Sequence, residues 1–405
     1  MEEKAGGNNN QGKNARAQRS GYITAKESRR ITKENRRITN KLERAYKRKS
    51  VPESEYMTNM RDPANIVEFD NLHTYFYTDI GTVKAVNGVT FDVPKGKTVG
   101  VVGESGCGKS VTSLSLMQLL QRPQGQITAG SIRVNCGADE GFRRKGADGY
   151  SAVDVAKAPQ YVMESLRGEV ASMIFQEPMT SLNPVMRIGA QIDEVTAQHQ
   201  PGLPREKVIA RSIEMIEMVG IANAAQVYRM YPHELSGGMR QRVMIAMALA
   251  CDPKLIIADE PTTALDVTIQ AQILDLLRGL KDRLSSAIML ITHDLGVIAE
   301  MADFVVVMYA GKVVEKGTTK DVFLAPAHPY TVGLMASKPV IGRVVERLYS
   351  ISGSVPNPIN MPDYCYFRDR CPKFREECLG PYPPEIALSD THFAACHRAR
   401  EEAKA

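Results

Sequence analysis

Residues 103–110, Gly-Glu-Ser-Gly-Cys-Gly-Lys-Ser, have the residue types and spacing of a phosphate-binding loop. The glycines let consecutive backbone N–H groups turn toward an anion, and a helix beginning at Lys109 would add the positive end of its dipole. We expect Lys109 to reach the β- and γ-phosphates of a nucleotide and Ser110 to hold Mg²⁺ through its hydroxyl group. The loop therefore predicts nucleotide binding.

Two carboxylates follow a second apolar run. Residues 255–258 have the pattern of a buried strand, and Asp259 and Glu260 stand at its end. Charges at the tip of a buried strand are costly unless a cation or a reaction uses them. Asp259 suits Mg²⁺, and Glu260 suits the polarising of a water molecule.

Two further strands also end in polar side chains. Gln176 follows a strand expected over 170–175, and His293 follows one expected over 287–291. Gln176 could contact Mg²⁺ and change position with whatever binds the loop beyond it, and His293 could contact a γ-phosphate. A glutamine or a lone histidine at such a position is more often structural, so both interpretations stay open at this point.

A second candidate anion-binding site lies at Ser236, Gly237 and Gly238, which open a helix. The aromatic residue Phe76, at the end of the first expected strand, could stack on an adenine ring, because stacking needs only a π face. The chain thus carries two phosphate-type loops and one candidate base-stacking residue.

The elements that must position these residues are strands alternating with helices. Strands are expected over 66–76, 82–93 and 98–102, and helices over 206–219 and 267–284. Such alternation implies an α/β fold with a mainly parallel sheet and a ligand at the carboxyl ends of its strands.

The composition of the 405-residue chain is that of a globular protein, with 43% hydrophobic and 24% charged residues. No apolar run reaches about eighteen residues, so we expect no membrane span, no signal peptide and a cytosolic chain. Residues 1–50 hold 15 basic and 5 acidic residues, while the whole chain has a net charge of +5. A solvated tail, docking to an anionic membrane surface or a partner, and nucleic-acid binding are open interpretations of this basic arm.

Taken together, the motifs over residues 66–330 resemble the nucleotide-binding subunit of an ABC transporter. The resemblance implies an α/β P-loop NTPase fold: an ABC ATPase domain with a RecA-like core, an antiparallel β subdomain and a helical subdomain, followed by a small cysteine-rich tail domain. In the family's order the motifs are the aromatic Phe76, Walker A at 103–110, the Q-loop residue Gln176, the signature at 235–238, Walker B at 255–259 with Glu260, the D-loop at 264–266 and the switch residue His293.

The resemblance also assigns roles to residues of this chain. It implies Glu260 as the general base, His293 as a γ-phosphate sensor and Gln176 as a catalytic residue. It implies a head-to-tail dimer in which each ATP lies between the Walker A of one subunit and the signature of the other. Mg²⁺ would be held by Ser110, Gln176 and Asp259. The nucleotide-binding residues would be Phe76, Gly103, Ser105, Gly106, Cys107, Gly108, Lys109, Ser110, Val111, Asp259, Ser236, Gly237, Gly238 and Asp266.

A narrower resemblance, to the branch that imports oligopeptides, dipeptides and nickel, rests on residues 176–184, 328–331 and 352–356. It implies an ATPase that powers peptide import at the cytoplasmic face of the membrane. The implied partners are two transmembrane permease subunits, a second, related ABC ATPase and, through the complex, an extracellular substrate-binding protein. No nucleic acid is expected. Import of nickel or another solute, and a non-transport ABC ATPase acting on nucleic acid or ribosomes, are the alternatives.

Four of the seven cysteines cluster near the end of the chain: Cys365, Cys371, Cys378 and Cys396. In a reducing compartment such a cluster indicates a metal rather than disulfides. Members of the branch can carry a [4Fe–4S] cluster here, and the lack of paired Cys-x₂-Cys spacing favours iron–sulfur over zinc, with an unmetallated site as a further alternative. The nearby His392 and His397 could replace a ligand or be solvated.

We therefore expect a basic, disordered or helical extension over 1–60, an ABC ATPase domain over 61–325 and a four-cysteine extension over 326–405. Within the ATPase domain we expect a helical subdomain at about 177–245 and an insertion loop at about 135–168.

Overall fold

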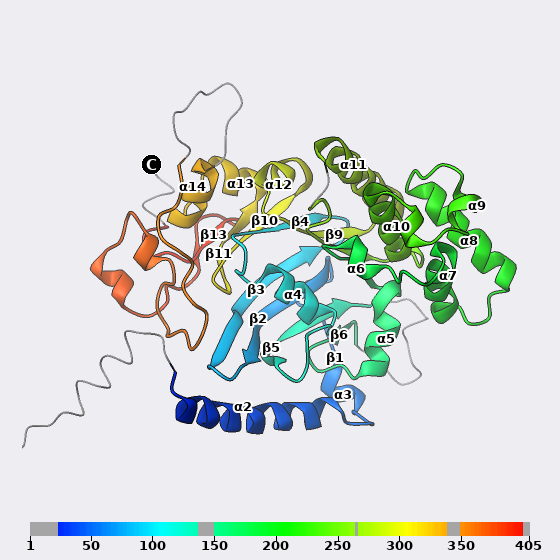
Figure 1. Ribbon diagram of the computed structural model, residues 1–405. Helices are drawn as coiled ribbons and strands as arrows, with labels where there is room; N and C mark the ends of the chain where they lie inside the picture. The colour runs from blue at the N-terminus through cyan, green and yellow to red at the C-terminus, as the bar shows by residue number, and fades with distance from the viewer. Residues whose placement is uncertain (1–22, 137–149, 264–265, 338–348, 400–405) are drawn as a thin grey trace, which may run out of the picture.

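An eight-stranded sheet runs through the centre of the molecule, in the order β12-β13-β11-β10-β4-β9-β8-β7 (Figure 1). The computed structural model describes residues 23–136, 150–263, 266–337 and 349–399. Strands β10, β4, β9, β8 and β7 are parallel, while β11, β13 and β12 are antiparallel to their neighbours. The strands are β4 Thr98–Val102, β7 Ala171–Ile174, β8 Leu255–Asp259, β9 Ala287–Ile291, β10 Phe304–Tyr309, β11 Lys312–Thr318, β12 Ile386–Ala387 and β13 Phe393–Ala394.

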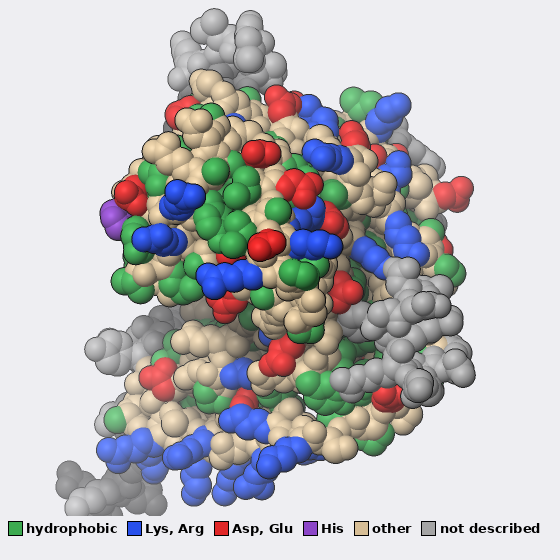
Figure 2. Space-filling model, turned by 90° about the vertical axis from the view of Figure 1, so that its right-hand side faces the viewer, with side chains coloured by type: hydrophobic (Ala, Val, Ile, Leu, Met, Phe, Trp, Pro, Cys, Tyr) green, Lys and Arg blue, Asp and Glu red, His purple; other side chains and the backbone are tan. Residues whose placement is uncertain are grey.

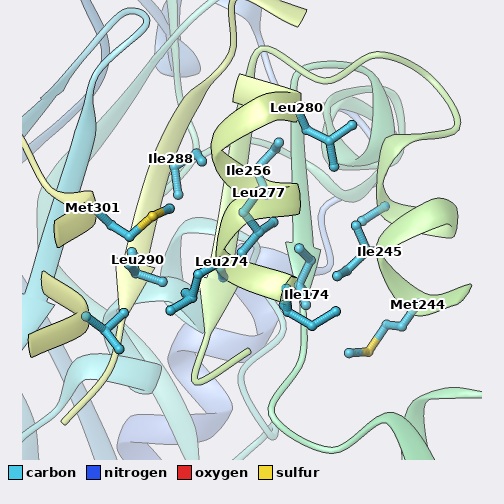
Figure 3. Packing of buried hydrophobic residues seen from close by; sticks show 14 of the residues in the cluster. Ile174, Met244, Ile245, Ile256, Leu274, Leu277, Leu280, Ile288, Leu290 and Met301 are labelled. Carbon is cyan, nitrogen blue, oxygen red and sulfur yellow. The ribbon is translucent and has the colours of Figure 1, made fainter. Parts of the chain in front are cut away.

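The parallel strands are buried because helices cover them. Every residue of β4, β8 and β9 is buried, as expected for near-continuous apolar runs in a parallel sheet. Figure 3 shows Leu274 and Leu277 of α11 (Val267–Leu284) packing toward Ile256 and Leu290 of the sheet. The strands and the helix predicted for these segments are confirmed, and with them the α/β class.

A second, antiparallel sheet has the order β1-β6-β5-β2-β3. Stacked rings of Phe69 and Phe91, with centroids 4.4 Å apart, lie in the core that it shares with one face of the parallel sheet. The predicted antiparallel part is thus present. Its strands are β1 Met57–Thr58, β2 Asn65–Tyr77, β3 Thr82–Pro94, β5 Gly125–Asn135 and β6 Ala152–Asp154.

A group of helices lies between β7 and β8 in the sequence and on the right of Figure 1. Its packing includes a partly buried polar contact, in which Asp193 accepts hydrogen bonds from Ser212 (2.5 Å) and Tyr228 (2.6 Å). This helical part consists of α6 Pro178–Ser181, α7 Ile188–His199, α8 Arg205–Met218, α9 Ala224–Val227, the 3₁₀ turn η1 Pro232–Glu234 and α10 Gly237–Leu249.

The remaining helices connect or cover the two sheets. They are α2 Ala25–Tyr46, α3 Glu53–Tyr56, α4 Lys109–Leu116, α5 Gln160–Glu169, α12 Leu295–Met301, α13 Thr319–Leu324, α14 Pro329–Ala336, η2 Arg368–Arg370 and η3 Glu376–Leu379. Among the described residues, none of the helices is both long enough and apolar enough to cross a membrane.

Helix α2 of the basic arm is folded against the antiparallel sheet. A capping box at Thr24 and Glu27 begins it. Asn35 Nδ2 donates to the carbonyl of Thr78 (2.7 Å), and Glu43 accepts a hydrogen bond from Gln126 (2.8 Å). Its lysines and arginines face outward and form a row along the lower edge of the molecule in Figure 2. Residues 1–22 of the predicted extension lie outside the described residues.

The extension expected over 1–60 ends earlier than predicted. Val51 and Tyr56 are buried in the core beneath the antiparallel sheet, and β1 pairs with β6. The sequence pattern missed this because the buried residues are few and widely spaced. Residues 51–60 are therefore part of the folded body.

The insertion loop expected over 135–168 is only partly irregular. Residues 152–154 form β6 and residues 160–169 form α5, whose Val162, Met163 and Leu166 are buried. The segment 137–149 lies outside the described residues. The glycine- and lysine-rich composition concealed two short elements that pack on the core.

The tail packs closely against the ATPase part. Met361, Tyr366 and Phe367 are buried in the same core as the parallel sheet, and β13 pairs with β11 at the sheet's edge. The Asn87 side chain on β3 also donates a hydrogen bond to the hydroxyl of Tyr366 (2.9 Å). The tail buries only a small cluster of its own, around Ala327, Ala394 and Ala399, while its large aromatic side chains share the core of the ATPase part. Residues 338–348 and 400–405 of this extension are outside the described ranges.

Burial of Tyr56 can be tested by truncating its ring. Tyr56 is 3% exposed, and Tyr150 is 44% exposed. Tyr56→Ala should lower the free energy of unfolding by about 3 kcal/mol because it leaves a cavity in the core. Tyr150→Ala should change it by less than about 0.5 kcal/mol. Urea unfolding measures both, and equal effects would show that residues 51–60 lie outside the core.

Candidate nucleotide-binding and hydrolysis site

The phosphate-binding loop leaves the end of β4 and runs into α4. Gly108, the residue before α4, has a φ of 102°. A Cβ atom there would lie 2.4 Å from the carbonyl oxygen of Ala85, so only glycine fits. Ser105 and Gly106 are exposed on the outer curve of the loop. The loop has the conformation that the glycine spacing predicts.

Lys109 is held inside this loop. Its side chain is buried, and Nζ donates to the carbonyl oxygens of Gly103 (2.8 Å) and Glu104 (3.2 Å). Cys107 is 1% exposed beneath the loop, and burial raises the pKa of its thiol. Cys107 therefore fills space in the core, while Lys109 presents a positive charge to the concave side of the loop.

Oxygen ligands for Mg²⁺ lie beside the loop. The Ser110 hydroxyl donates to Asp259 Oδ1 at 3.0 Å, which joins the start of α4 to the end of β8. Burial raises the pKa of Asp259, and the Ser110 hydrogen bond and the charge of Lys109 oppose this. Mg²⁺ takes one or two protein oxygens together with water and substrate phosphates, so this pair fits the ion.

Glu260 is the centre of a cluster formed by neighbouring strand ends. Its carboxylate accepts hydrogen bonds from Gln176 Nε2 (3.1 Å) and Thr263 Oγ1 (2.9 Å), and His293 Nδ1 lies 3.4 Å away. Its backbone has a φ of 47°, and its N–H donates to the carbonyl of Ile291 (2.8 Å). The structure thus brings Gln176, Glu260 and His293 together, with the amide nitrogen of Gln176 bound to Glu260. The role of Gln176 as a ligand of Mg²⁺ stays a prediction.

Thr263 was not among the predicted site residues. It lies three positions after Glu260, and its N–H donates to the Glu260 carbonyl (3.2 Å), which closes a turn. A hydroxyl residue in the turn after a strand-end carboxylate is the signal that could have identified it.

Phe76 lies at the end of β2, where its half-buried ring covers Gly125 of β5. A Cβ atom on Gly125 would lie 2.7 Å from the ring, so the glycine makes room for it. The ring is fixed in place, and its stacking on adenine stays a prediction. Val111, in the first turn of α4, is partly buried against the core.

The Ser-Gly-Gly sequence opens α10 in the helical part. The Ser236 hydroxyl accepts from the Met239 N–H (3.3 Å), and Ser236 and Gly237 are exposed. A Cβ atom on Gly237 would meet nothing within 4 Å, so the approach to this helix end is open. Asp266 caps α11 by accepting from the Ile269 N–H (2.9 Å). Residues 264–265 of the predicted D-loop lie outside the described residues.

Four cysteines of the tail line one small pocket, together with Phe367 and His397: Cys365, Cys371, Cys378 and Cys396. Burial raises the pKa of Cys365 and Cys396 to about 11. In the described residues, no three His, Cys, Asp or Glu side chains converge as the ligands of one metal ion do. His392 Nε2 donates to the buried Glu315 carboxylate at 2.8 Å, whereas His397 Nε2 is buried with no hydrogen-bond partner among the described residues.

Replacing Gly108 tests the loop geometry. Gly108→Ala should weaken ATP binding by about tenfold or more, because an overpacked contact of this kind costs about 1–3 kcal/mol. Gly96 is the matched control, since its φ is also positive (65°) and a Cβ atom there would meet nothing within 4 Å. Gly96→Ala should bind ATP as the parent does. Titration with a fluorescent ATP analogue measures both, and equal affinities would contradict the assigned geometry.

The chain matches two family models. The model described as ABC transporter matches residues 86–263, and the one described as oligopeptide/dipeptide transporter, C-terminal region, matches residues 314–378. The structure also resembles a dimeric structure of the ATP-binding cassette MJ0796 in a post-hydrolysis state with ADP and Pi, with a TM-score of 0.53 and 23% identity over 62% of this chain and 98% of that one. This structural likeness shows the fold alone.

Curated proteins are more similar in sequence. The chain is 45% identical to the oligopeptide transport ATP-binding protein OppD of Salmonella typhimurium over 86% of this chain and 98% of that protein. It is 44% identical to the dipeptide transport ATP-binding protein DppD of Bacillus subtilis, over 82% and 94%. With the oligopeptide transport ATP-binding protein AppD of Bacillus subtilis it shares 48% identity over 84% and 98%. The chain therefore belongs to the family of ABC transporter ATP-binding proteins of oligopeptide and dipeptide transport.

Proposed function

We propose that this chain is the ATP-hydrolysing subunit of a multi-subunit transporter that imports di- and oligopeptides. The observation that carries the proposal is the meeting of the Ser110–Asp259 pair and the Glu260 cluster at the carboxyl ends of adjacent parallel strands. The names of the similar proteins support a peptide as the cargo.

Each residue has a physical task in phosphoryl transfer to water. Lys109 would neutralise phosphate charge, and Ser110 and Asp259 would hold Mg²⁺, which when bound neutralises further charge on the phosphates. Glu260 would accept a proton from the attacking water, because its two hydrogen-bond donors hold the carboxylate in one orientation. His293, with an exposed side chain beside Glu260, would contact the γ-phosphate.

The second half of each nucleotide site would come from another subunit. Figure 1 shows α10 in the helical part and α4 near the centre of the molecule. The open approach to Gly237 leaves space for a phosphate brought by a partner. We propose a head-to-tail pair with a related ABC ATPase, closed by ATP and released by hydrolysis.

A permease subunit has a suitable docking place next to Gln176. A pocket of about 410 Å³ lies where the helical part meets the parallel sheet, and apolar side chains from both parts, such as Met173, Phe175 and Met244, line much of it. Met179, just beyond Gln176, is 65% exposed. We propose that a permease segment binds here at the cytoplasmic face of the membrane and that an extracellular substrate-binding protein joins through the permease pair.

The four-cysteine pocket would hold a [4Fe–4S] cluster. Four thiols lining one pocket are a suitable donor set, and the unpartnered His397 Nε2 adds a buried polar atom beside them. In a cubane cluster each cysteine binds a different iron, so the thiols need not converge on one point as four zinc ligands must. Neutral thiols would lose their protons on binding the cluster.

Substituting Glu260 tests the hydrolytic role. Glu260→Gln should retain ATP binding and lower ATP turnover by about a hundredfold or more, because a general base contributes at least that much. The control is Glu300→Gln, because Glu300 of α12 is an exposed carboxylate paired with Arg278 of α11, and this variant should turn over normally. In membrane vesicles with the permease subunits, Glu260→Gln should also abolish ATP-dependent uptake of a labelled peptide. Normal turnover in Glu260→Gln would contradict the assignment, and uptake of nickel in place of peptide would change the cargo.

Anaerobic purification tests the cluster. The chain should contain iron and acid-labile sulfide and show a visible thiolate-to-iron absorption band. Cys378→Ser should lose the band, while Cys251→Ser, outside the pocket, should keep it. A colourless protein containing zinc, or no metal, would overturn the cluster assignment.

A further inference from the structure

The phosphate-binding loop is held from outside by the tail. Glu104, the second residue of the loop, donates its backbone N–H to the hydroxyl of Tyr330 at 2.8 Å. Its carboxylate accepts from Arg370 Nη1 at 3.0 Å and 3.2 Å. Two residues more than 220 positions further along the chain therefore hold the same loop residue, one by its backbone and one by its side chain.

Arg370 is itself fixed. Its side chain is 7% exposed, and Nη1 also donates to the Tyr309 hydroxyl (3.2 Å). Nε donates to the carbonyl of Ser352 (3.0 Å), and Nη2 donates to that of Ile351 (3.4 Å). A buried guanidinium with this many acceptors has little freedom to move. It therefore fixes the position of whatever it binds.

Tyr330 is equally constrained. It is 0% exposed, and its ring packs against those of Tyr309 and Phe367, with centroids 4.7 Å and 5.5 Å away. The Tyr330 N–H donates to His328 Nδ1 at the start of α14 (3.1 Å), and the His328 N–H donates to the buried Glu315 (2.9 Å). The hydroxyl that meets the loop is thus placed by a rigid, buried set of contacts.

The loop needs such support for two reasons. Its glycines supply no side chains to anchor it, and an unfixed loop visits many conformations. In addition, the carboxylate of Glu104 would repel a phosphate bound nearby, and pairing with Arg370 neutralises that charge. Lys109 Nζ donates to the carbonyl of Glu104 as well, so Glu104 also contacts the lysine that is expected to bind the phosphates.

We propose that Tyr330 and Arg370 are positioning residues that preorganise the phosphate-binding loop for the nucleotide through Glu104. Together with Glu104 they form the Glu104 clamp. The proposal rests on the nucleotide site of the proposed function. The clamp touches neither Glu260 nor His293, so it acts on ATP affinity rather than on the hydrolysis step. The apparent affinity for ATP is proportional to the fraction of molecules whose loop is in the binding conformation, so it falls when the loop leaves that conformation.

The test compares ATP affinity and turnover in full-length variants. Arg370→Met should raise the KM and the Kd for ATP by about tenfold and leave kcat within about twofold of the parent. Arg370→Lys, which keeps the charge but not the forked geometry, should restore part of the affinity. Glu104→Gln combined with Arg370→Met should weaken binding no more than Arg370→Met alone, because both remove one interaction.

A matched control separates the clamp from general docking of the tail. Lys316 on β11 pairs with Glu385 of the tail at 2.9 Å, away from the loop. Glu385→Gln should leave the ATP affinity unchanged. Equal weakening by Glu385→Gln and Arg370→Met, or unchanged affinity in Arg370→Met, would overturn the proposal.

A failure to fold and a failure of the proposed function can each be distinguished from a failure of the clamp. Should Arg370→Met fail to fold, Arg370→Lys and Tyr330→Phe decide the matter, since each keeps the side chain's volume; unchanged affinity in both overturns the clamp. A parent chain that binds no ATP would contradict the proposed function instead. If the parent binds ATP and the clamp variants bind it with the same affinity as the parent, the clamp is rejected and the proposed function is not.

Discussion

The parallel alignment of β7, β8, β9 and β4 is the constraint on which the candidate site depends. Its register pairs Asp259 with Ile291 and Ile291 with Val101, so the phosphate loop, the two carboxylates and His293 all leave the same edge of the sheet. Strands β8 and β9 are buried and apolar up to their last residues, so the polar side chains of the site are found where these strands end. A slip of one residue in β8 would bury a carboxylate and remove it from this edge.

Sequence patterns predicted the parts of the site that are local. The strand at 287–291 and the helix at 267–284 have the predicted bounds, and the strand predicted over 255–258 extends one residue further, to Asp259. These segments were predictable because continuous apolar runs and a helical period reflect burial directly. The sequence predicted that Gln176, Glu260 and His293 each follow a strand, and the observed strand order brings them together. Thr263 was missed because its role depends on a turn, and Glu104 was missed because its partners lie far along the chain.

The largest difference from expectation concerns the tail. The four-cysteine extension has few, scattered aromatic residues. This pattern is typical of a small domain that is stabilised by a metal because it cannot bury a sufficient core. Here Tyr366 and Phe367 instead enter the core of the parallel sheet, and β13 lengthens that sheet. Burial of this kind depends on a surface that another part of the chain provides, and no local pattern records it. The tail is thereby brought into contact with the nucleotide loop.

The loop and the helical part differ in how they are held, and this bears on the proposed mechanism. The loop is fixed on several sides, by β4, by α4 and by the tail. The helical part, which carries Ser236, follows Gln176 in the chain, and Gln176 reaches Glu260 through one hydrogen bond. A permease bound beside Gln176 could thus shift the signature residues and the catalytic carboxylate together while the phosphates stay in place. Such an arrangement would link transport to hydrolysis without disturbing the bound nucleotide.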